Sequence, residues 1–187
     1  MTDIKDIDAD IDTCSRYIRM HQHATVECVA FKTSGKIEIV DKERLEGLNA
    51  EVDRLSALVS HNSKVLEQLT GALGTFPSLS AARERRDYVD GIVKRSKGLL
   101  RVDLANLIKI RADIDPADPF KHPDARKLKD ETDRILADSI PERERVDKLI
   151  KQAEAIIADF QPSSLRPIQD GSSFSQAIIR DSVGGLV

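Results

Sequence analysis

Hydrophobic residues recur at alternating spacings of three and four between residues 45 and 73, and this is the clearest pattern in the chain. The positions seven apart are Leu45, Val52, Val59, Leu66 and Leu73, and those three residues after the first four are Leu48, Leu55, Asn62 and Leu69. A heptad pattern over four repeats is typical of a long helix that buries a narrow stripe against other helices. It predicts a helix over residues 42–73, with Asp41 as its N-cap and Gly74 and Pro77 at its end.

Weaker patterns of the same period predict further helices. The first covers residues 2–22 with Thr2 as its N-cap, and another covers 80–112 with Ser80 at its start. Apolar residues between 102 and 114 also alternate as in a strand, but the helix is favoured. A helix over 123–138 is expected to stop before Ser139-Ile140-Pro141-Glu142, a capping-box pattern that predicts a new helix reaching residue 160.

Two segments interrupt the helical pattern. Residues 24–40 are rich in β-branched residues and contain the turn-forming Thr33-Ser34-Gly35, which predicts a β-hairpin with strands near 25–32 and 36–40. The free edges of such a hairpin would suit strand addition between protomers. Residues 113–123 contain three prolines and are expected to form a corner.

These elements predict a mainly α protein: an elongated helical bundle or coiled coil with one small β-hairpin and an extended C-terminal arm. The expected divisions are an N-terminal helix with the hairpin (1–40), the helical region (41–160) and the arm (161–187). The arm is rich in Ser and Gly, yet it carries apolar residues that would serve to dock it onto a neighbour: Leu165, Ile168, Phe174, Ile178 and Ile179. An unfolded tail is the alternative.

Asn62 is the one polar residue at a d position of the heptads. A buried amide at such a position can fix the register and strand number of an oligomeric coiled coil. Alternatively, Asn62 faces a wet gap inside a bundle formed by one chain.

The composition narrows the class of protein. Of 187 residues, 40% are hydrophobic and 33% are charged, which argues against global disorder. Aromatic residues make up only 4%, with no Trp, so an aromatic-lined pocket is hard to build. A net charge of −3 excludes a strongly basic protein, and no apolar run approaches the roughly 20 residues that span a bilayer. Without a visible secretory signal, the default expectation is cytoplasmic synthesis, which also suits a protein incorporated into a particle.

Patterns that would indicate catalysis or a metal site fail on their spacing. The acidic run Asp6–Asp12 lacks the glycine and the final bidentate acid of a calcium loop. His21 and His23 lie between Cys14 and Cys28, but without the spacing of a zinc finger. No nucleophile elbow, P-loop, dinucleotide fingerprint or HExxH motif occurs. The sequence therefore predicts no catalytic residues, no metal and no cofactor. Two buried free thiols are favoured for Cys14 and Cys28, and a bridge between them, which requires the intervening segment to fold back, is the alternative.

One basic stretch lies between residues 83 and 101, and five of its cations can share a helical face: Arg83, Arg86, Lys94, Lys97 and Arg101. Such a face could bind phosphates by counterion release. An ordinary solvated surface is the alternative, because most charge runs are solvated.

The preferred hypothesis is a non-enzymatic structural or assembly protein. It would form a dimer or trimer through the 45–73 heptads and dock onto other subunits, as in components of large particles such as a phage virion or tail; no membrane partner is expected. The alternative is a regulatory adaptor that binds nucleic acid or an acidic partner through the basic face. An enzyme with an unfamiliar helical site is a third hypothesis.

Overall fold

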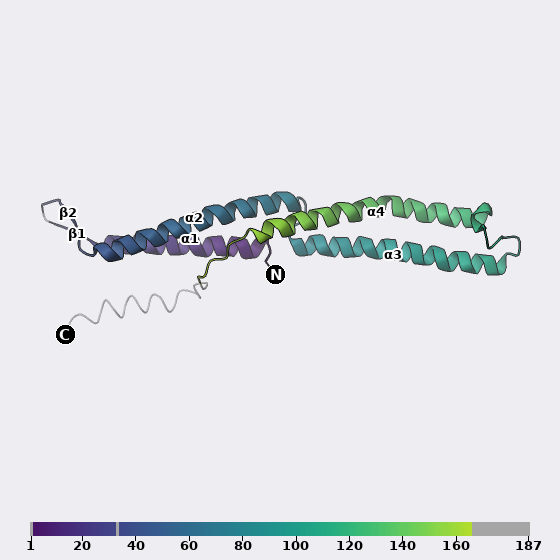
Figure 1. Ribbon diagram of the computed structural model, residues 1–187, viewed down its shortest axis with the longest axis horizontal. Coiled ribbons are helices and arrows are strands. Elements are labelled where there is room, and N and C mark those ends of the chain that lie inside the picture. Colours follow the sequence, from purple (N-terminus) through teal and green to yellow (C-terminus); the bar gives the residue numbers. More distant parts are fainter. Residues whose placement is uncertain (1, 33, 166–187) are drawn as a thin grey trace, which may run out of the picture. The chain divides into compact units, whose positions relative to one another are not determined.

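The computed structural model describes residues 2–32 and 34–165 and confirms a mainly α protein with one small antiparallel hairpin (Figure 1). The elements in chain order are α1 (Ile4–Glu27), β1 (Val29–Phe31), β2 (Ile37–Ile39), α2 (Lys42–Leu73), α3 (Leu79–Ile110), the short 3-10 helix η1 (Pro119–Lys121) and α4 (Pro123–Ala158). Two compact units contain them: unit 1 is Met1–Glu67 with Asp159–Val187, and unit 2 is Gln68–Ala158. The three-segment division expected from the sequence stays a prediction.

In unit 1, helix α1 begins later than expected and ends five residues later. Asp3, not Thr2, is the N-cap, because Asp3 and Asp6 form a reciprocal capping box in which the Asp3 N–H donates to the Asp6 carboxylate over 2.8 Å. At the other end α1 continues to Glu27, and the predicted first strand is correspondingly too long. The extra helical turn ends at Cys28, whose side chain is fully buried and whose N–H donates to the carbonyl of Thr25.

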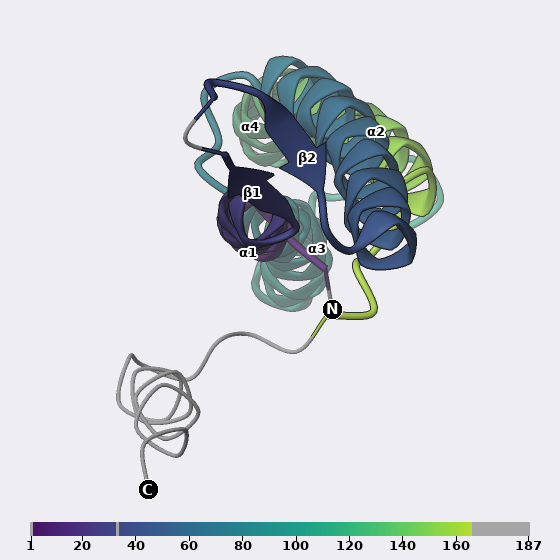
Figure 2. The same cartoon turned by 90° about the vertical axis from the view of Figure 1, so that its left-hand side faces the viewer.

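The hairpin lies where α1 ends and α2 begins (Figure 2). Its register pairs Val29 with Ile39 and Phe31 with Ile37, and its turn contains Gly35 at a positive φ of 72°. The left-handed conformation favours glycine there, in agreement with the turn expected from the sequence.

Helix α2 has the bounds expected from its heptads. The Asp41 carboxylate accepts from the N–H of Arg44 over 3.0 Å, which confirms Asp41 as a cap. Gly74 follows the last turn at a φ of 59°, the left-handed conformation common just after a helix C-terminus.

In unit 2, helix α3 is capped by Ser78, so the prediction of Ser80 is wrong. The Ser78 hydroxyl accepts from the N–H of Ala81 over 3.0 Å, and this earlier start brings Leu79 into the first turn, where it is buried. The helix continues to Ile110, which confirms the helical interpretation of residues 99–110 over the alternating one.

Helix α4 runs unbroken through Pro141, so the predicted break before Ser139 is wrong. Proline inside a helix removes one backbone hydrogen bond and typically costs about 3 kcal/mol. Packing on α3 after Pro141 offsets this cost, because Val146 and Ile150 are buried and each such side chain contributes about 1.5–3 kcal/mol. Two ion pairs beside Pro141 contribute less: Arg85 with Glu142 at 3.3 Å and Asp90 with Arg143 at 3.5 Å. The two helices are joined through η1 and pack against each other as an antiparallel pair (Figure 1).

Candidate functional site

The predicted oligomer seam on α2 divides into covered and half-covered positions. Three d positions are buried within the chain: Leu55, Asn62 and Leu69. The last a position, Leu73, is buried as well. The other seam residues are only half-buried: Leu45, Leu48, Val52, Val59 and Leu66. One chain therefore covers part of this stripe, and self-association through the remainder stays a prediction.

Asn62 is held by partners from its own chain. Its side-chain amide donates to the Gln161 carbonyl over 2.8 Å, and its carbonyl accepts from the Gln161 N–H over 3.2 Å. Next to it, the Asp10 carboxylate accepts from the N–H of Ser163 at 3.1 Å and from the Ser163 hydroxyl. We call Asp10, Asn62, Gln161 and Ser163 the polar clasp. It attaches the segment after α4 to helices α1 and α2 within unit 1.

His61 adds a further contact to the same segment, with Nε2 lying 2.7 Å from the carbonyl oxygen of Asp159. A carbonyl only accepts hydrogen bonds, so Nε2 carries the proton in this contact. Neighbouring residues of α2 thus bind the chain at two points just after α4, and together they fix the position of residues 159–163.

Of the residues predicted for the docking arm, Leu165 belongs to the described part of the chain. Leu165 is half-buried at the end of the described chain. The other four lie outside the described residues: Ile168, Phe174, Ile178 and Ile179.

Both cysteines are buried and free, as expected. Burial raises the pKa of the Cys14 thiol, against a smaller opposing effect of its hydrogen bond with Ser163. A raised pKa disfavours the thiolate, the reactive form of cysteine, so Cys14 acts as a packing residue beside the clasp. Within residues 2–32 and 34–165, no three His, Cys, Asp or Glu side chains gather in a way that could hold a metal ion.

The β-hairpin presents an apolar face. Directly paired residues of an antiparallel pair share a face, so the register brings four apolar side chains to the same side: Val29, Phe31, Ile37 and Ile39. We call this set the hairpin face. Phe31 is 76% exposed, Ile37 65% and Ile39 52%. The neighbouring charges, Lys32 and Glu38, pair with each other.

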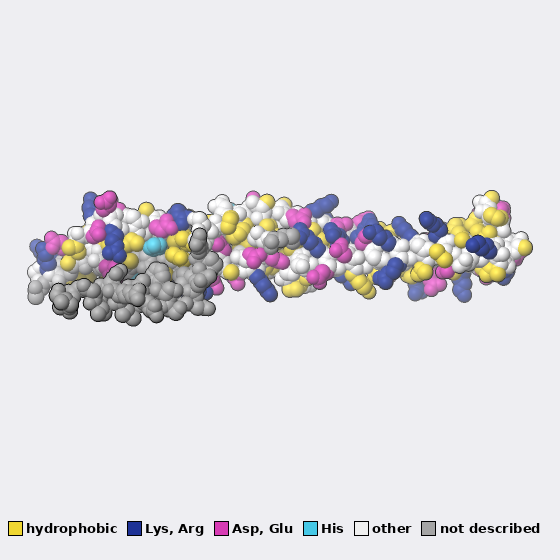
Figure 3. All heavy atoms as spheres, turned by 90° about the horizontal axis from the view of Figure 1, so that it is seen from below, with side chains coloured by type: hydrophobic (Ala, Val, Ile, Leu, Met, Phe, Trp, Pro, Cys, Tyr) yellow, Lys and Arg dark blue, Asp and Glu magenta, His cyan; other side chains and the backbone are white. Residues whose placement is uncertain are grey.

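The basic face predicted on α3 is largely neutralised within the chain. Arg83 pairs with Glu154 at 2.5 Å, and Lys94 pairs with Asp90 at 2.6 Å. Arg86 pairs with Asp87 at 2.7 Å and lies 4.0 Å from the carboxylate of Asp147 on α4. Positive and negative side chains are interspersed over the α3 and α4 part of the molecular face in Figure 3. Of the five predicted cations, Lys97 and Arg101 have no ion pair in the described part of the chain, so anion binding would depend on these two.

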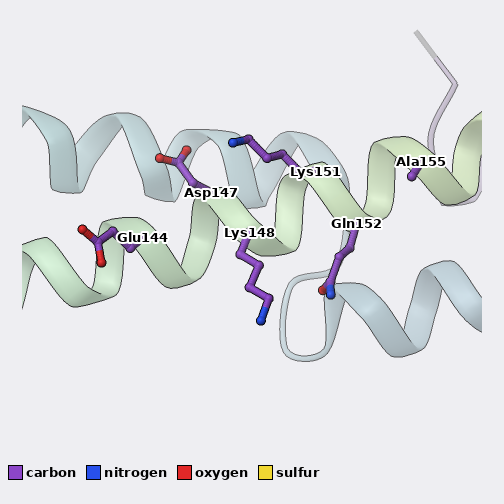
Figure 4. Close-up of a pocket in the computed structure, with 6 residues that line it drawn as sticks. All are labelled: Glu144, Asp147, Lys148, Lys151, Gln152 and Ala155. Carbon is purple, nitrogen blue, oxygen red and sulfur yellow. The ribbon is translucent and has the colours of Figure 1, made fainter.

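A shallow hollow on α4 is lined by residues of that helix alone: Glu144, Asp147, Lys148, Lys151, Gln152 and Ala155 (Figure 4). Asp147 and Lys151 point to one side of the helix, whereas Lys148 and Gln152 point to the opposite side. These polar groups do not converge on one point, so the hollow offers no arrangement for binding a small ligand.

A polar cluster closes the turn between α3 and α4. Asp113 accepts from Arg111 at 3.2 Å and lies 3.1 Å from Nε2 of His122, while Arg111 also pairs with Asp124 at 3.2 Å. The pKa of Asp113 is lowered to about 2, mainly by its hydrogen bond with the Arg111 guanidinium. The cluster joins the end of one helix to the start of the next, which is a structural role.

Two of these features were not predicted from the sequence. The hairpin face could have been found from the apolar alternation at 29, 31, 37 and 39 once the hairpin register was fixed. The polar clasp had no such signal, because its members are separated by up to 153 positions along the chain.

No helix in the described part of the chain is long and apolar enough to cross a membrane. No protein-family model matches the chain, and neither the curated proteins nor the solved structures contain a match. Function is therefore inferred from the surfaces of the molecule alone.

Proposed function

We propose that this chain is a non-enzymatic structural or assembly protein that self-associates and docks onto neighbouring subunits. The observation that carries the proposal is the hairpin face, whose three most exposed members each leave more than half of their surface to solvent. Contiguous exposed apolar patches of this kind mark protein interaction sites, because leaving them in water is unfavourable.

The partner that fits the hairpin face is a second copy of this chain. A two-stranded hairpin is marginal by itself and gains stability when another layer covers its apolar side. The face has no charge of its own, so two copies can stack face to face as in a β-sandwich, at a spacing of about 10 Å. The half-buried heptad residues of α2 would extend such a contact along the helix, in the register expected from the sequence.

Incorporation into a larger particle is part of the same proposal. The clasp fixes the point from which the chain continues beyond residue 165, where the apolar residues of the arm begin. A self-associating surface, together with a segment after α4 that is held at residues 159–163, suits a protein that joins subunits in an assembly.

The first test is the absolute mass of the full chain by light scattering over a concentration series at two salt concentrations. A dimer or trimer supports the proposal, whereas a monomer at every concentration overturns self-association. The double variant Phe31→Ser/Ile37→Ser should dissociate the oligomer. Val40→Ser is the matched control, because Val40 is 65% exposed like Ile37 but lies outside the hairpin face.

A further inference from the structure

A groove runs between α3 and α4 in the part of the pair nearest the connecting turn. Its sides are Leu99 and Asp103 of α3 and Glu131 and Ile135 of α4, and Leu100 and Leu128 lie deeper. We call it the outer groove. It continues along the helices to Leu107, because Leu128 and Glu131 line both of its parts.

The interior of the outer groove is mainly apolar, with Ser96 and Thr132 as its uncharged polar lining residues. Leu100 and Leu128 are half-buried, and the neighbouring Thr132 hydroxyl donates to the carbonyl of Leu128 over 2.9 Å. Leu99 is 61% exposed and Ile135 is 40% exposed, so both sides present aliphatic surface to solvent. The groove therefore suits apolar side chains.

Two acidic residues stand at the edges of this apolar surface, one on each helix. Asp103 and Glu131 are exposed, and neither has an ion pair within residues 2–32 and 34–165. Nearer the other end of the same helix pair, Glu142 and Glu154 are paired with arginines of α3. Two further charged residues line the part of the groove near Leu107: Asp124, which pairs with Arg111, and the cation Lys127. The outer groove thus combines aliphatic surface with a lining of three acidic residues and one basic residue, which is net negative.

We propose that the outer groove binds an amphipathic helix of another protein, with an apolar stripe flanked by Lys or Arg. Its apolar residues would cover Leu99, Leu107 and Ile135, while its cations would pair with Asp103 and Glu131. Recognition of an amphipathic helix by a hydrophobic groove is a common mode of peptide binding. The span from Leu99 to Leu107 extends over about 12 Å, or roughly two turns of a bound helix.

A second copy of this chain fits the outer groove less well. Packing two grooves against each other would bring Asp103 and Glu131 of both copies together, and like charges at an interface are unfavourable. The inference rests on the proposed function, since it names the chemistry of a neighbouring subunit. It uses a surface separate from the hairpin face.

The test uses the full chain and two synthetic helical peptides with identical apolar residues at i, i+3/i+4 and i+7. One carries Lys at the flanking positions, and the other carries Glu. We expect the Lys peptide to bind, with affinity that decreases as salt increases, and the Glu peptide to bind at least tenfold more weakly. Equal binding of both peptides, or no binding of the Lys peptide up to millimolar concentration, would overturn the inference.

Variants locate the binding site. Leu99→Ser should weaken binding of the Lys peptide several-fold, because it removes apolar surface without changing the charge, and Ala105→Ser is the control at an exposed position of α3 outside the groove. The double variant Asp103→Asn/Glu131→Gln should weaken binding about fivefold, as expected for two exposed ion pairs. Circular dichroism checks that each variant is folded.

The outcomes separate this inference from the proposed function. If Leu99→Ser binds the Lys peptide as wild type does, the outer groove is not its site and the inference fails. Self-association measured by light scattering is unaffected by that result. If the chain is monomeric at every concentration but binds the Lys peptide at the groove, self-association fails and the inference holds.

Discussion

The two ends of the α3/α4 pair have the same helical pattern but different surroundings. The inner half comprises residues 79–93 with 142–158, and the outer half comprises 96–110 with 123–135. The inner half buries small and aliphatic side chains of both helices: Ala82, Val89, Val93, Val146, Ile150 and Ala153. The outer half leaves four large aliphatic side chains 40–76% exposed: Leu99, Val102, Ile110 and Ile135.

Ion pairs between the two helices also differ along their length. Among the described residues none joins 96–110 to 123–135, and at that end Arg111, just beyond α3, pairs with Asp124. In the inner half, Arg83 and Arg85 form ion pairs across the helix pair with Glu154 and Glu142. The period of the hydrophobic pattern determines which face of a helix is apolar, but a narrow seam between two helices covers only part of that face. The difference between the two halves therefore separates residues that stabilise the fold from residues available to a partner.

The largest expected difference is between Ile150→Ala and Leu99→Ala. Ile150 is 4% exposed, so its truncation should lower the free energy of unfolding by about 2–5 kcal/mol. Leu99 is 61% exposed, and its truncation should change stability by no more than about 0.5 kcal/mol. Urea unfolding followed by circular dichroism measures both. Equal losses would show that the outer half is covered in solution and would remove the contrast.

The same comparison between a buried and an exposed position can be made for polar residues of α2, with Asn62 of the polar clasp as the buried one. Asn62→Leu keeps the side chain close in size but leaves the Gln161 N–H and carbonyl without their partner. Gln161 is exposed, so water can replace the lost partner, and the variant should lose only the net contribution of the two hydrogen bonds, about 0.5–1.5 kcal/mol each. Asn49→Leu, at an exposed position of the same helix, is the matched control and should be nearly neutral.

Amide hydrogen exchange reports the same variant locally. The N–H groups of Gln161 and Ser163 should exchange faster in Asn62→Leu than in wild type, whereas Asn49→Leu should leave them protected. Unchanged protection in Asn62→Leu would mean that the clasp does not hold this segment.

The helices were predictable because their signals are local. The heptads of α2, its Asp41 cap and Gly74 are contained in the segment itself, and the structure agrees with them. The errors arose where nonlocal contacts decided the outcome. The local signals at Ser139 and Pro141 favour a break, but α4 is one continuous helix whose packing on α3 continues past the proline, with Val146 and Ile150 buried.

The candidate surfaces were less accessible to prediction than the helices. Heptads do not distinguish a stripe covered by the same chain from one covered by another, so the seam on α2 could be recognised while its partner could not. The basic face was predicted from charges along one helix, but Arg83 is paired by Glu154, which is 71 residues away. Pairing across such distances depends on the packed helix pair, which the sequence pattern alone does not specify.

The smallest expected effects concern acid pH, where the inner and outer ends should again differ. Arg145, and then Arg85, lower the pKa of Glu142 from its ordinary value of 4.5. A carboxyl group with a lowered pKa in the folded state stabilises the protein above its unfolded pKa, and this contribution is lost as the pH falls through the folded pKa. Stability should therefore decline below about pH 4.5.

Replacing the two carboxyl groups should separate their contributions. Glu142→Gln should be less stable than wild type at pH 7, with the difference shrinking as the pH falls below about 4.5. Asp113→Asn should also be less stable than wild type at pH 7. For this variant the difference should shrink at lower pH, between the ordinary pKa of 3.8 and the folded-state pKa of about 2. The Asp113 effect should be smaller and more sensitive to salt, because that side chain is 59% exposed compared with 26% for Glu142.

Thermal unfolding at pH 7, 4 and 2.5, in low and high salt, measures these differences. Glu144→Gln is the control, since Glu144 is exposed and has no ion pair within residues 34–165. If Asp113→Asn and Glu142→Gln changed thermal stability equally in low and in high salt, ion pairs at the inner and outer ends of unit 2 would contribute equally to stability. The contrast between its two ends would then concern apolar burial alone.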